Sequence, residues 1–239
     1  MKILIIPFLM LSMVSACSKK EQQSFSPPVI IPQPSAGTDS LTYLALGDSY
    51  TIGQSVDVLA RYPVQAKGLL RADSILISAP EIIARTGWTT KDLINTLTVS
   101  PPRRSHYDIV SLLIGVNNQY QHLSQDQYRV EFALLLDSAI RYAGNKRDRV
   151  FVLSIPDYSV TPFASGYNRA VIAKEIDEFN AINKEITRAA SCYYIDITAS
   201  TRQAANDPSL ICPDGLHPSG IEYNKWASLL ADAIKFSLR

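Results

Sequence analysis

Three residues have the chemistry of acyl transfer, one near the start of the chain and two near its end. Ser49 stands in "LALGDSYTIG", where an apolar run stops and a hydroxyl follows directly. Asp214 and His217 lie three residues apart in "CPDGLHPSG". A serine is a weak nucleophile until a base takes its proton, and a carboxylate that hydrogen-bonds one imidazole nitrogen leaves the other nitrogen free to be that base. These residues predict a nucleophile, Ser49, a base, His217, and an orienting acid, Asp214.

Structural roles remain open for each of these residues. A serine after a glycine turn can cap a helix, and Asp214 and His217 can form an exposed pair in a turn bounded by prolines. The other histidines are weaker candidates for the base. His106 precedes a predicted strand and falls on the amino side of the sheet, and His122 has no acid at a fixed offset.

Short apolar runs alternate with segments of helical spacing after residue 40. The predicted strands are 41–46, 75–84 with a break near Pro80, 107–115, 149–156 and 192–198. The predicted helices are 62–72, 89–97, 124–143, 168–190 and 219–238. This alternation predicts parallel βαβ units, and strands that are apolar on both faces predict a sheet covered on both sides. We therefore expect a three-layer α/β/α sandwich with a mostly parallel sheet of about five strands.

Two details of the helices are also predicted. Thr89 and Ser219 are expected to cap the helices that follow them. Helix 124–143 is expected to bury an apolar stripe that contains Val130, Leu134, Leu135 and Ala139.

Polar motifs follow four of the predicted strands. They are "GDS" (47–49), "RTGWTT" (85–90), "GVNNQY" (115–120) and "DGLHP" (214–218). Functional groups in open parallel sheets gather beyond the carboxyl ends of the strands. We therefore expect these motifs to meet at one end of the sheet.

In this order, the four motifs resemble those of the SGNH hydrolases, also called GDSL esterases, over roughly residues 41–236. The resemblance implies an SGNH or flavodoxin-like fold and a Ser-His-Asp acyl-enzyme mechanism that needs no metal and no cofactor. It also implies an oxyanion hole made by the backbone N–H groups of Ser49 and Gly87 and by the side-chain amide of Asn117. Gly87 also suits a turn with positive φ, which is compatible with that role, and Asn117 can instead hydrogen-bond a loop.

The third motif departs from the family pattern, because Asn118 stands where the family has an aspartate. That aspartate is interpreted as a loop organiser, so the departure affects the loop and leaves the reaction unchanged. Asp48 is expected to anchor its turn by hydrogen bonds, and Asp157 is a candidate for the pocket rim. The aromatic residues after strands either form a wall for an acyl or sugar group or roof the core, and the roof is favoured; they are Trp88, Tyr120 and Tyr158.

The leading prediction is an enzyme that hydrolyses carboxylic esters, either acetyl esters of carbohydrates or esters of lipids such as lysophospholipids. The alternatives are an acyltransferase on the same fold and a non-catalytic lipoprotein that binds a glycan or lipid. The chain has 23 basic and 22 acidic side chains, interspersed, with a net charge of +1, so no basic face indicates a nucleic-acid partner. We expect a monomer whose partners are small-molecule, glycan or lipid esters.

The N-terminal segment indicates export and an anchor. "MKILIIPFLMLSMVSAC" has a lysine, an apolar run too short to span a membrane, and small residues before Cys17. "VSAC" resembles the lipobox of bacterial lipoproteins, which implies a signal peptide at 1–16 and a lipidated N-terminal Cys17; an ordinary signal peptide with a chance cysteine is the alternative. Residues 17–40 then form a Pro-rich tether and 41–239 the hydrolase domain. We expect a membrane-anchored lipoprotein, in the outer membrane of a Gram-negative source and facing the periplasm or the cell surface, because Ser18 and not an aspartate follows Cys17.

Cys192 and Cys212 are expected as two separate thiols. Cys192 stands at the start of a predicted strand and Cys212 in the loop beyond its far end. Five extended residues span about 17 Å, so the alternative, a disulfide, requires the loop to fold back. The sequence has no CxxC or HxxxH spacing, and no metal site is expected.

Overall fold

The computed structural model describes residues 40–239, and the predictions for Cys17 and the rest of residues 1–39 lie outside this part of the chain. Within it, five parallel strands form one sheet in the order β2-β1-β3-β4-β5. The strands are β1 (Tyr43–Asp48), β2 (Glu81–Arg85), β3 (Ile109–Leu113), β4 (Val150–Leu153) and β5 (Tyr193–Ile195). The strand order changes direction between β1 and β3, and open parallel sheets bind ligands beyond the carboxyl ends of the strands at such a point.

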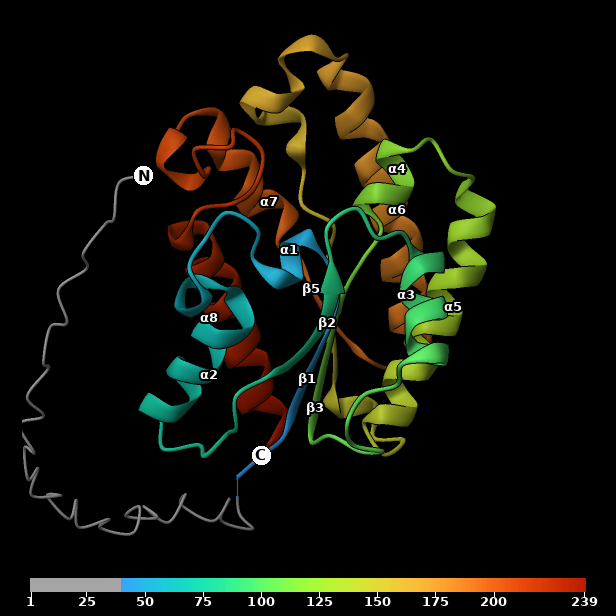
Figure 1. The fold of residues 1–239 in the computed structure, drawn as a ribbon, viewed down its shortest axis with the longest axis vertical. Coiled ribbons are helices and arrows are strands. Elements are labelled where there is room, and N and C mark those ends of the chain that lie inside the picture. Colours follow the sequence, from blue (N-terminus) through green and yellow to red (C-terminus); the bar gives the residue numbers. More distant parts are fainter. Residues whose placement is uncertain (1–39) are drawn as a thin grey trace, which may run out of the picture. The chain divides into compact units, whose positions relative to one another are not determined.

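Helices cover both faces of the sheet. In Figure 1, α2 and α8 pack together on one face, while α3, α5 and α6 lie on the other. The long helices are α2 (Tyr62–Ala72), α3 (Thr90–Val99), α5 (Gln125–Tyr142), α6 (Arg169–Ala189) and α8 (Gly220–Ser237). The short ones are α1 (Ser49–Ile52), α4 (Val116–Tyr120) and α7 (Thr198–Thr201), with 3₁₀ turns η1 (Val58–Ala60), η2 (Arg147–Arg149), η3 (Tyr158–Val160), η4 (Pro162–Gly166), η5 (Arg202–Ala205) and η6 (Pro208–Leu210). The predicted three-layer α/β/α sandwich is confirmed.

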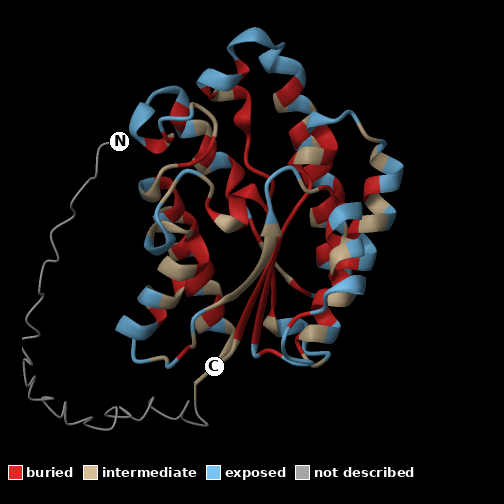
Figure 2. Ribbon diagram, in the orientation of Figure 1, coloured by how far each residue is buried: buried red, intermediate tan, exposed pale blue. Residues whose placement is uncertain are grey.

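The centre of the sheet forms the core of the domain. Strands β1, β3 and β4 are buried at every residue, and the inner faces of the helices pack on them (Figure 2). Strand β2 is only partly buried because it lies at the edge of the sheet. Burial on both faces explains the near-continuous apolar sequence "IVSLL" of β3.

The second strand is shorter than predicted. The prediction covered 75–84, but β2 begins at Glu81, and Ile77 makes only an isolated bridge with Leu41. Pro80 separates the two parts, because proline has no backbone N–H to donate to a strand ladder. The polar motif that begins at Arg85 nevertheless follows β2, as predicted.

The buried face of α5 differs from the predicted stripe. Val130 and Leu134 are exposed, whereas Leu135 and Ala139 are buried as predicted. Two aromatic residues, Tyr128 and Phe132, begin the buried face and set its position. The prediction followed aliphatic residues alone and therefore placed part of the stripe on the wrong side of the helix.

The two predicted helix caps have different outcomes. Thr89 accepts a hydrogen bond from the backbone N–H of Asp92, and the Asp92 side chain accepts one from the backbone of Thr89, which completes a capping box. Ser219 occupies the N-cap position of α8, but its hydroxyl is buried and makes no hydrogen bond. Ser219 therefore occupies the predicted N-cap position, but its side chain does not make the predicted capping hydrogen bond.

The two cysteines of the described residues are separate thiols, as predicted. Cys212 Sγ lies 3.2 Å from the carbonyl oxygen of Pro218, and Cys192 Sγ lies 3.8 Å from that of Ala190. Both side chains are buried.

Candidate active site

Ser49 is the first residue of α1 and follows β1 directly. The side chain of Asp48 accepts a hydrogen bond of 3.0 Å from the backbone N–H of Tyr50, so the predicted anchoring role of Asp48 is confirmed. Gly47 has no room for a Cβ atom, which would collide with the Thr51 side chain and the carbonyl oxygen of Leu113. Gly53 ends the helix in the left-handed conformation, with φ of 63°. The two glycines that flank Ser49 therefore shape a tight turn that presents the serine at the end of the sheet.

Asp48 carries an unusual carboxyl group. The residue is fully buried, and its Oδ2 atom has no hydrogen-bond partner. Burial raises the pKa of this carboxyl to about 7, against which the hydrogen bond from Tyr50 N–H acts. The hydrogen-bond partner of the His217 ring is Asp214, so Asp48 does not orient the histidine.

Asp214 and His217 contact each other within one turn. The carboxylate Oδ2 of Asp214 lies 2.7 Å from Nδ1 of His217, and Oδ1 accepts hydrogen bonds of 2.9 Å from the backbone N–H groups of Leu216 and His217. The hydroxyl of Ser55 also donates to Oδ2. Although partial burial acts in the opposite direction, these hydrogen bonds hold the pKa of Asp214 at about 2. The carboxylate is therefore charged at neutral pH and holds Nδ1 of the ring.

The turn that carries this pair is closed at both ends. The backbone N–H of Cys212 donates to the carbonyl oxygen of His217 at 2.7 Å, and Ile211 pairs with Pro218 in an antiparallel bridge. His217 is 5% exposed, and its ring lies 5.5 Å from that of Tyr50, measured between centroids. Packing and backbone closure thus fix the position of the imidazole.

Ser49 and His217 both line a small cavity. It has a volume of about 140 Å³ and lies at the carboxyl ends of the strands. Its lining contains Ser49, Asn117 and His217 together with Tyr50, Val116, Tyr120, Tyr158, Phe163 and Leu216. Residues from the first, third and fourth predicted polar motifs therefore meet there.

A hydrogen bond joins α4, which carries Asn117, to the turn after β2, which carries Gly87. The amide Nδ2 of Asn117 donates a hydrogen bond of 2.9 Å to the carbonyl oxygen of Trp88. This bond uses one of its two hydrogens and leaves the other available. Gly87 has φ of 81°, which confirms the predicted turn, but it does not line the cavity that contains Ser49.

Asn118 joins α4 to the start of α3. Its Oδ1 accepts from the backbone N–H of Thr90 at 3.0 Å, and its Nδ2 donates to the Thr90 hydroxyl at 2.7 Å. That hydroxyl in turn donates to Glu131 on α5. The side chain is buried and holds three elements together, as a loop organiser does.

The predictions for Tyr120 and for Asp157 need correction. Tyr120 lines the cavity and is exposed, so the favoured interpretation as a roof is wrong for it. Tyr158 lines the cavity and is also part of the buried core, and Trp88 packs against the core without lining the cavity, so both agree with the roof. Asp157 is not on the rim, because its buried carboxylate accepts from Ser159 N–H and pairs with Arg202 at 2.8 Å. Its position after β4 was correct, but its side chain points into the protein.

Several residues of the site escaped sequence reasoning. Ser55 lies in a loop with φ of 68° and reaches Asp214, while Phe163 and Leu216 enter the cavity lining from loops. None of them belongs to a periodic pattern. Only Leu216 had a usable signal, because it lies inside the "DGLHP" motif.

A model of the GDSL-like lipase/acylhydrolase family matches residues 45–223. The chain belongs to this family. It is an ester-hydrolysing enzyme, and the matched region contains Ser49, Asp214 and His217. Among curated proteins, none is significantly similar to this hydrolase.

Solved structures share the fold of the hydrolase. An acetylxylan esterase from Geobacillus stearothermophilus has a TM-score of 0.63 at 20% identity, over 81% of this chain and 94% of that protein. The lipase Lip_vut3 from a goat rumen metagenome has a TM-score of 0.66 at 20% identity, over 81% and 97%. TesA has a TM-score of 0.65 at 13% identity, over 82% and 99%. At these identities the likeness shows the α/β/α fold.

Residues 40–239 contain neither a metal-binding cluster nor a membrane-spanning helix. Across residues 40–239, no group of three or more His, Cys, Asp or Glu side chains is placed to hold a metal ion. No helix in this same part of the chain has the length and apolar character needed to cross a membrane.

Proposed function

We propose that Ser49, His217 and Asp214 hydrolyse a carboxylic ester through an acyl-enzyme. The observation that carries this proposal is the contact of 2.7 Å between Asp214 and His217, whose ring lines the same cavity as Ser49. A charged carboxylate fixed on Nδ1 keeps that nitrogen protonated and leaves Nε2 as the basic atom.

The reaction proceeds in two halves. His217 takes the proton of Ser49 as its hydroxyl oxygen attacks the ester carbonyl, and the imidazolium then protonates the leaving alcohol. Water replaces the alcohol, gives its proton to His217 and attacks the acyl-enzyme. Collapse of that second intermediate releases the acid and returns the proton to Ser49.

The oxyanion is held by the backbone N–H groups of Ser49 and Gly87 and by Nδ2 of Asn117. The hydrogen bond from Asn117 to Trp88 supports this assignment, because it joins the amide to the residue after Gly87. Gly87 does not line the cavity, so its N–H reaches the oxyanion only if the turn after β2 moves toward Ser49.

The small cavity favours an ester with a short acyl group. A volume of about 140 Å³ also has to hold the reacting carbonyl, which leaves little room for a long chain. A series of nitrophenyl esters with acyl groups from acetate to decanoate tests this point. We expect kcat/KM to be highest for acetate and butyrate and to fall with longer chains; a maximum at octanoate or decanoate contradicts it.

Fluorophosphonate labelling tests the nucleophile. The folded protein should be labelled once, at Ser49, and Ser49→Ala should not be labelled. Ser138→Ala, which removes a partly exposed hydroxyl on α5, is the matched control and should label fully. Absence of labelling in folded wild-type protein, or labelling at another residue, contradicts the assignment.

We also propose that the enzyme is exported and held on a membrane by lipid at Cys17. Support comes from the sequence of residues 1–40, with its short apolar run, the "VSAC" motif and the Pro-rich tether. Ser18 after the cysteine favours the outer membrane in a Gram-negative source.

A further inference from the structure

Four aromatic side chains form one cluster at the mouth of the cavity. They come from α4, η3, η4 and the residue after η4, and we call them the aromatic platform: Tyr120, Tyr158, Phe163 and Tyr167. The rings of Phe163 and Tyr167 are stacked, 5.7 Å apart with an interplanar angle of 23°, and Tyr120 lies 5.9 Å from Phe163. Three of the four remain between 37% and 50% exposed. An exposed aromatic group of this size beside a reactive cavity indicates a binding surface.

The platform is attached to the turn that carries His217. The backbone N–H of Phe163 donates a hydrogen bond of 2.9 Å to the carbonyl oxygen of Gly215, and a Cβ atom on Gly215 would lie 3.3 Å from Pro162. Phe163 and Leu216 both line the cavity. Phe163, and Tyr167 stacked on it, therefore lie on the histidine side of the site, whereas Tyr120 lies on α4 together with Asn117.

The histidine side is where the alcohol part of the substrate leaves. This step rests on the proposed function, in which His217 protonates the departing alkoxide. A group bound against the His217 turn is therefore the alcohol part of the ester and not its acyl group.

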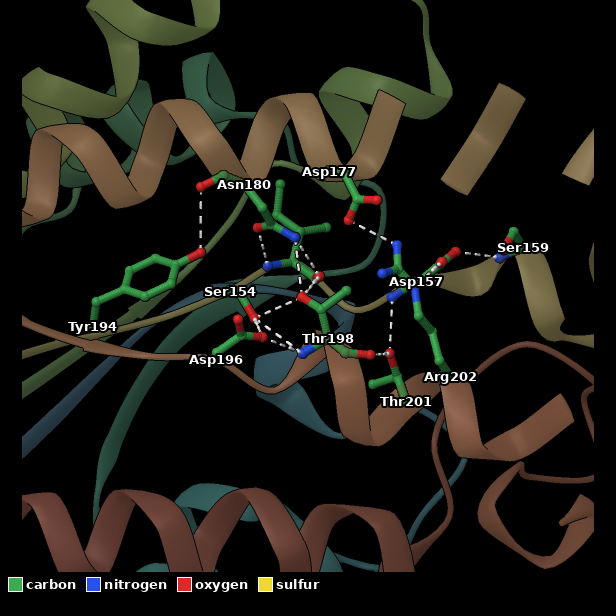
Figure 3. A network of polar contacts seen from close by, with 11 residues as sticks. Ser154, Asp157, Ser159, Asp177, Asn180, Tyr194, Asp196, Thr198, Thr201 and Arg202 are labelled. Atoms are coloured by element: carbon green, nitrogen blue, oxygen red, sulfur yellow. Dashed lines mark hydrogen bonds and ion pairs between the residues drawn. The ribbon is translucent and has the colours of Figure 1, made fainter. Parts of the chain in front are cut away.

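A partly buried polar network holds the chain between β4 and η3, the turn that carries Tyr158 (Figure 3). Where the chain leaves β4, Asn180 accepts from the N–H of Ile155 at 2.7 Å and donates to its carbonyl oxygen at 2.9 Å. Asp157 then accepts from Ser159 N–H and pairs with Arg202, which also binds Asp177 at 2.7 Å. These bonds fix the start of η3, the turn that carries Tyr158. Tyr158, the buried member of the platform, is thus preorganised, which lowers the cost of binding.

The chemistry of the platform selects a neutral ring. Its members are uncharged, and no lysine or arginine lines the cavity, so nothing there would pair with a phosphate group. The tyrosine hydroxyls of Tyr120 and Tyr167 lie 3.5 Å apart at an exposed edge, where they can bond a polyol. The stacked pair of Phe163 and Tyr167 offers an apolar ring face beside these hydroxyls. Such a surface matches a pyranose, which has an apolar C–H face and polar equatorial groups. We propose that the aromatic platform binds the alcohol part of the ester and that this alcohol is a sugar.

Two acetates with the same acyl group test this inference. One is a methyl glucopyranoside acetylated on its primary hydroxyl, and the other is ethyl acetate, whose alcohol part has no ring. The measured quantity is the ratio of kcat/KM for the glycoside acetate to kcat/KM for ethyl acetate. In Phe163→Ala and Tyr167→Ala we expect this ratio to fall about three- to tenfold, through KM, as the loss of one stacking contact predicts. Tyr167→Phe, which keeps the ring, should retain most of the ratio.

The control variant is Phe236→Ala, which removes an exposed aromatic ring near the end of α8. Its ratio should equal that of the wild type. Binding without turnover gives an independent readout: the Ser49→Ala variant should bind the acetylated glycoside, measured by saturation-transfer NMR, and adding Tyr167→Ala should weaken that binding.

The outcomes separate this inference from the proposed function. If wild-type enzyme hydrolyses ethyl acetate and is labelled at Ser49, but the ratio is unchanged in Phe163→Ala and Tyr167→Ala, the sugar site is wrong. An equal loss on both acetates also overturns it, because the platform is then only structural. A selective loss on ethyl octanoate overturns it as well, since the platform would then bind the acyl chain. Failure of the wild type to react with ethyl acetate or the fluorophosphonate is instead a failure of the proposed function.

Discussion

At the scale of single residues, two aspartates show how environment decides the charge of a carboxyl group. Asp214 accepts hydrogen bonds from Ser55, from backbone N–H groups and from His217, and its pKa is about 2. Asp48 is buried with one oxygen unpaired, and its pKa is about 7. Both lie within a few residues of the proposed reacting groups. The first therefore remains charged across the neutral range, while the second changes its charge within that range.

The charge of Asp214 is testable by substitution. Asp214→Asn preserves the size of the side chain and an oxygen for the N–H groups of Leu216 and His217, but it removes the negative charge beside Nδ1. The ring then loses its orientation and tautomer, so kcat should fall by about 10²–10⁴. Ester hydrolysis and circular dichroism would be measured together. A folded variant with near-normal kcat would show that Asp214 does not assist His217.

Asp48 should make stability depend on pH. At low pH the carboxyl is neutral in both folded and unfolded protein. Between its ordinary pKa of 3.8 and its folded pKa of about 7, the unfolded state ionises first, so stability falls as pH rises. Above pH 7 the folded protein bears the full cost of an ionised, buried Asp48 carboxylate, about 4 kcal/mol at about 1.4 kcal/mol per pKa unit.

The Asp48→Asn variant lacks this titration. Relative to wild type, this variant should be more stable at pH 8 than at pH 4, so the difference in free energy of unfolding (variant minus wild type), measured by urea unfolding, should be more positive at pH 8. Asp57→Asn, at an exposed site, is the control, and it should change the free energy of unfolding by the same small amount at both pH values. An equal difference between Asp48→Asn and wild type at both pH values would refute the raised pKa.

At the scale of elements, periodic segments were predictable and short ones were not. Helix α2 has the predicted bounds, and α5 and α6 each begin and end within one residue of the prediction. Helices α1 and α4 were missed, because four or five residues are too few to show a helical period.

The polar motifs located the site because they follow strands, which the fold brings to one end of the sheet. The contact from Ser55 to Asp214 and the aromatic platform were not predictable, because they depend on loops that meet only in the folded chain. A short window of sequence does not show which distant loops come into contact.

The bond network of Asn118 predicts the effect of an aspartate at that position. Asn118→Asp removes the donor to Thr90 and places a second carboxylate near the hydroxyl that donates to Glu131. The buried hydroxyl oxygen of Thr90 then loses the hydrogen bond from position 118, so we expect a loss of about 1–3 kcal/mol in stability at pH 7. The loss should shrink at pH 4, where carboxyl groups take up protons. Thermal unfolding at both pH values measures this, and a variant as stable as wild type at pH 7 would rule out the network as described.

At the scale of the whole molecule, the proposed anchor and the folded domain should be separable. Cys17→Ala should move the protein from the membrane fraction to the soluble fraction, because stable anchoring needs covalent lipid and no helix of residues 40–239 can span a bilayer. Hydrolysis of ethyl acetate should be unchanged, since every residue assigned to the site lies in the folded domain. A variant that remains in the membrane fraction would exclude lipid at Cys17, and a soluble, folded variant without activity would show that the tether is not passive.

Ser49 and His217 lie far apart in the sequence, and this distance decides when the site forms as the chain is made. Ser49 follows β1 and His217 follows β5, so the site exists only after all five strands have paired and the turn from Ile211 to Pro218 has closed. Contacts between such distant segments form late in folding, because the intervening chain must first be ordered. A nascent chain on the ribosome, or one threading through a translocation channel, therefore carries the nucleophile without its base. If the protein is exported as proposed, it is inactive while it crosses the membrane and until it has folded.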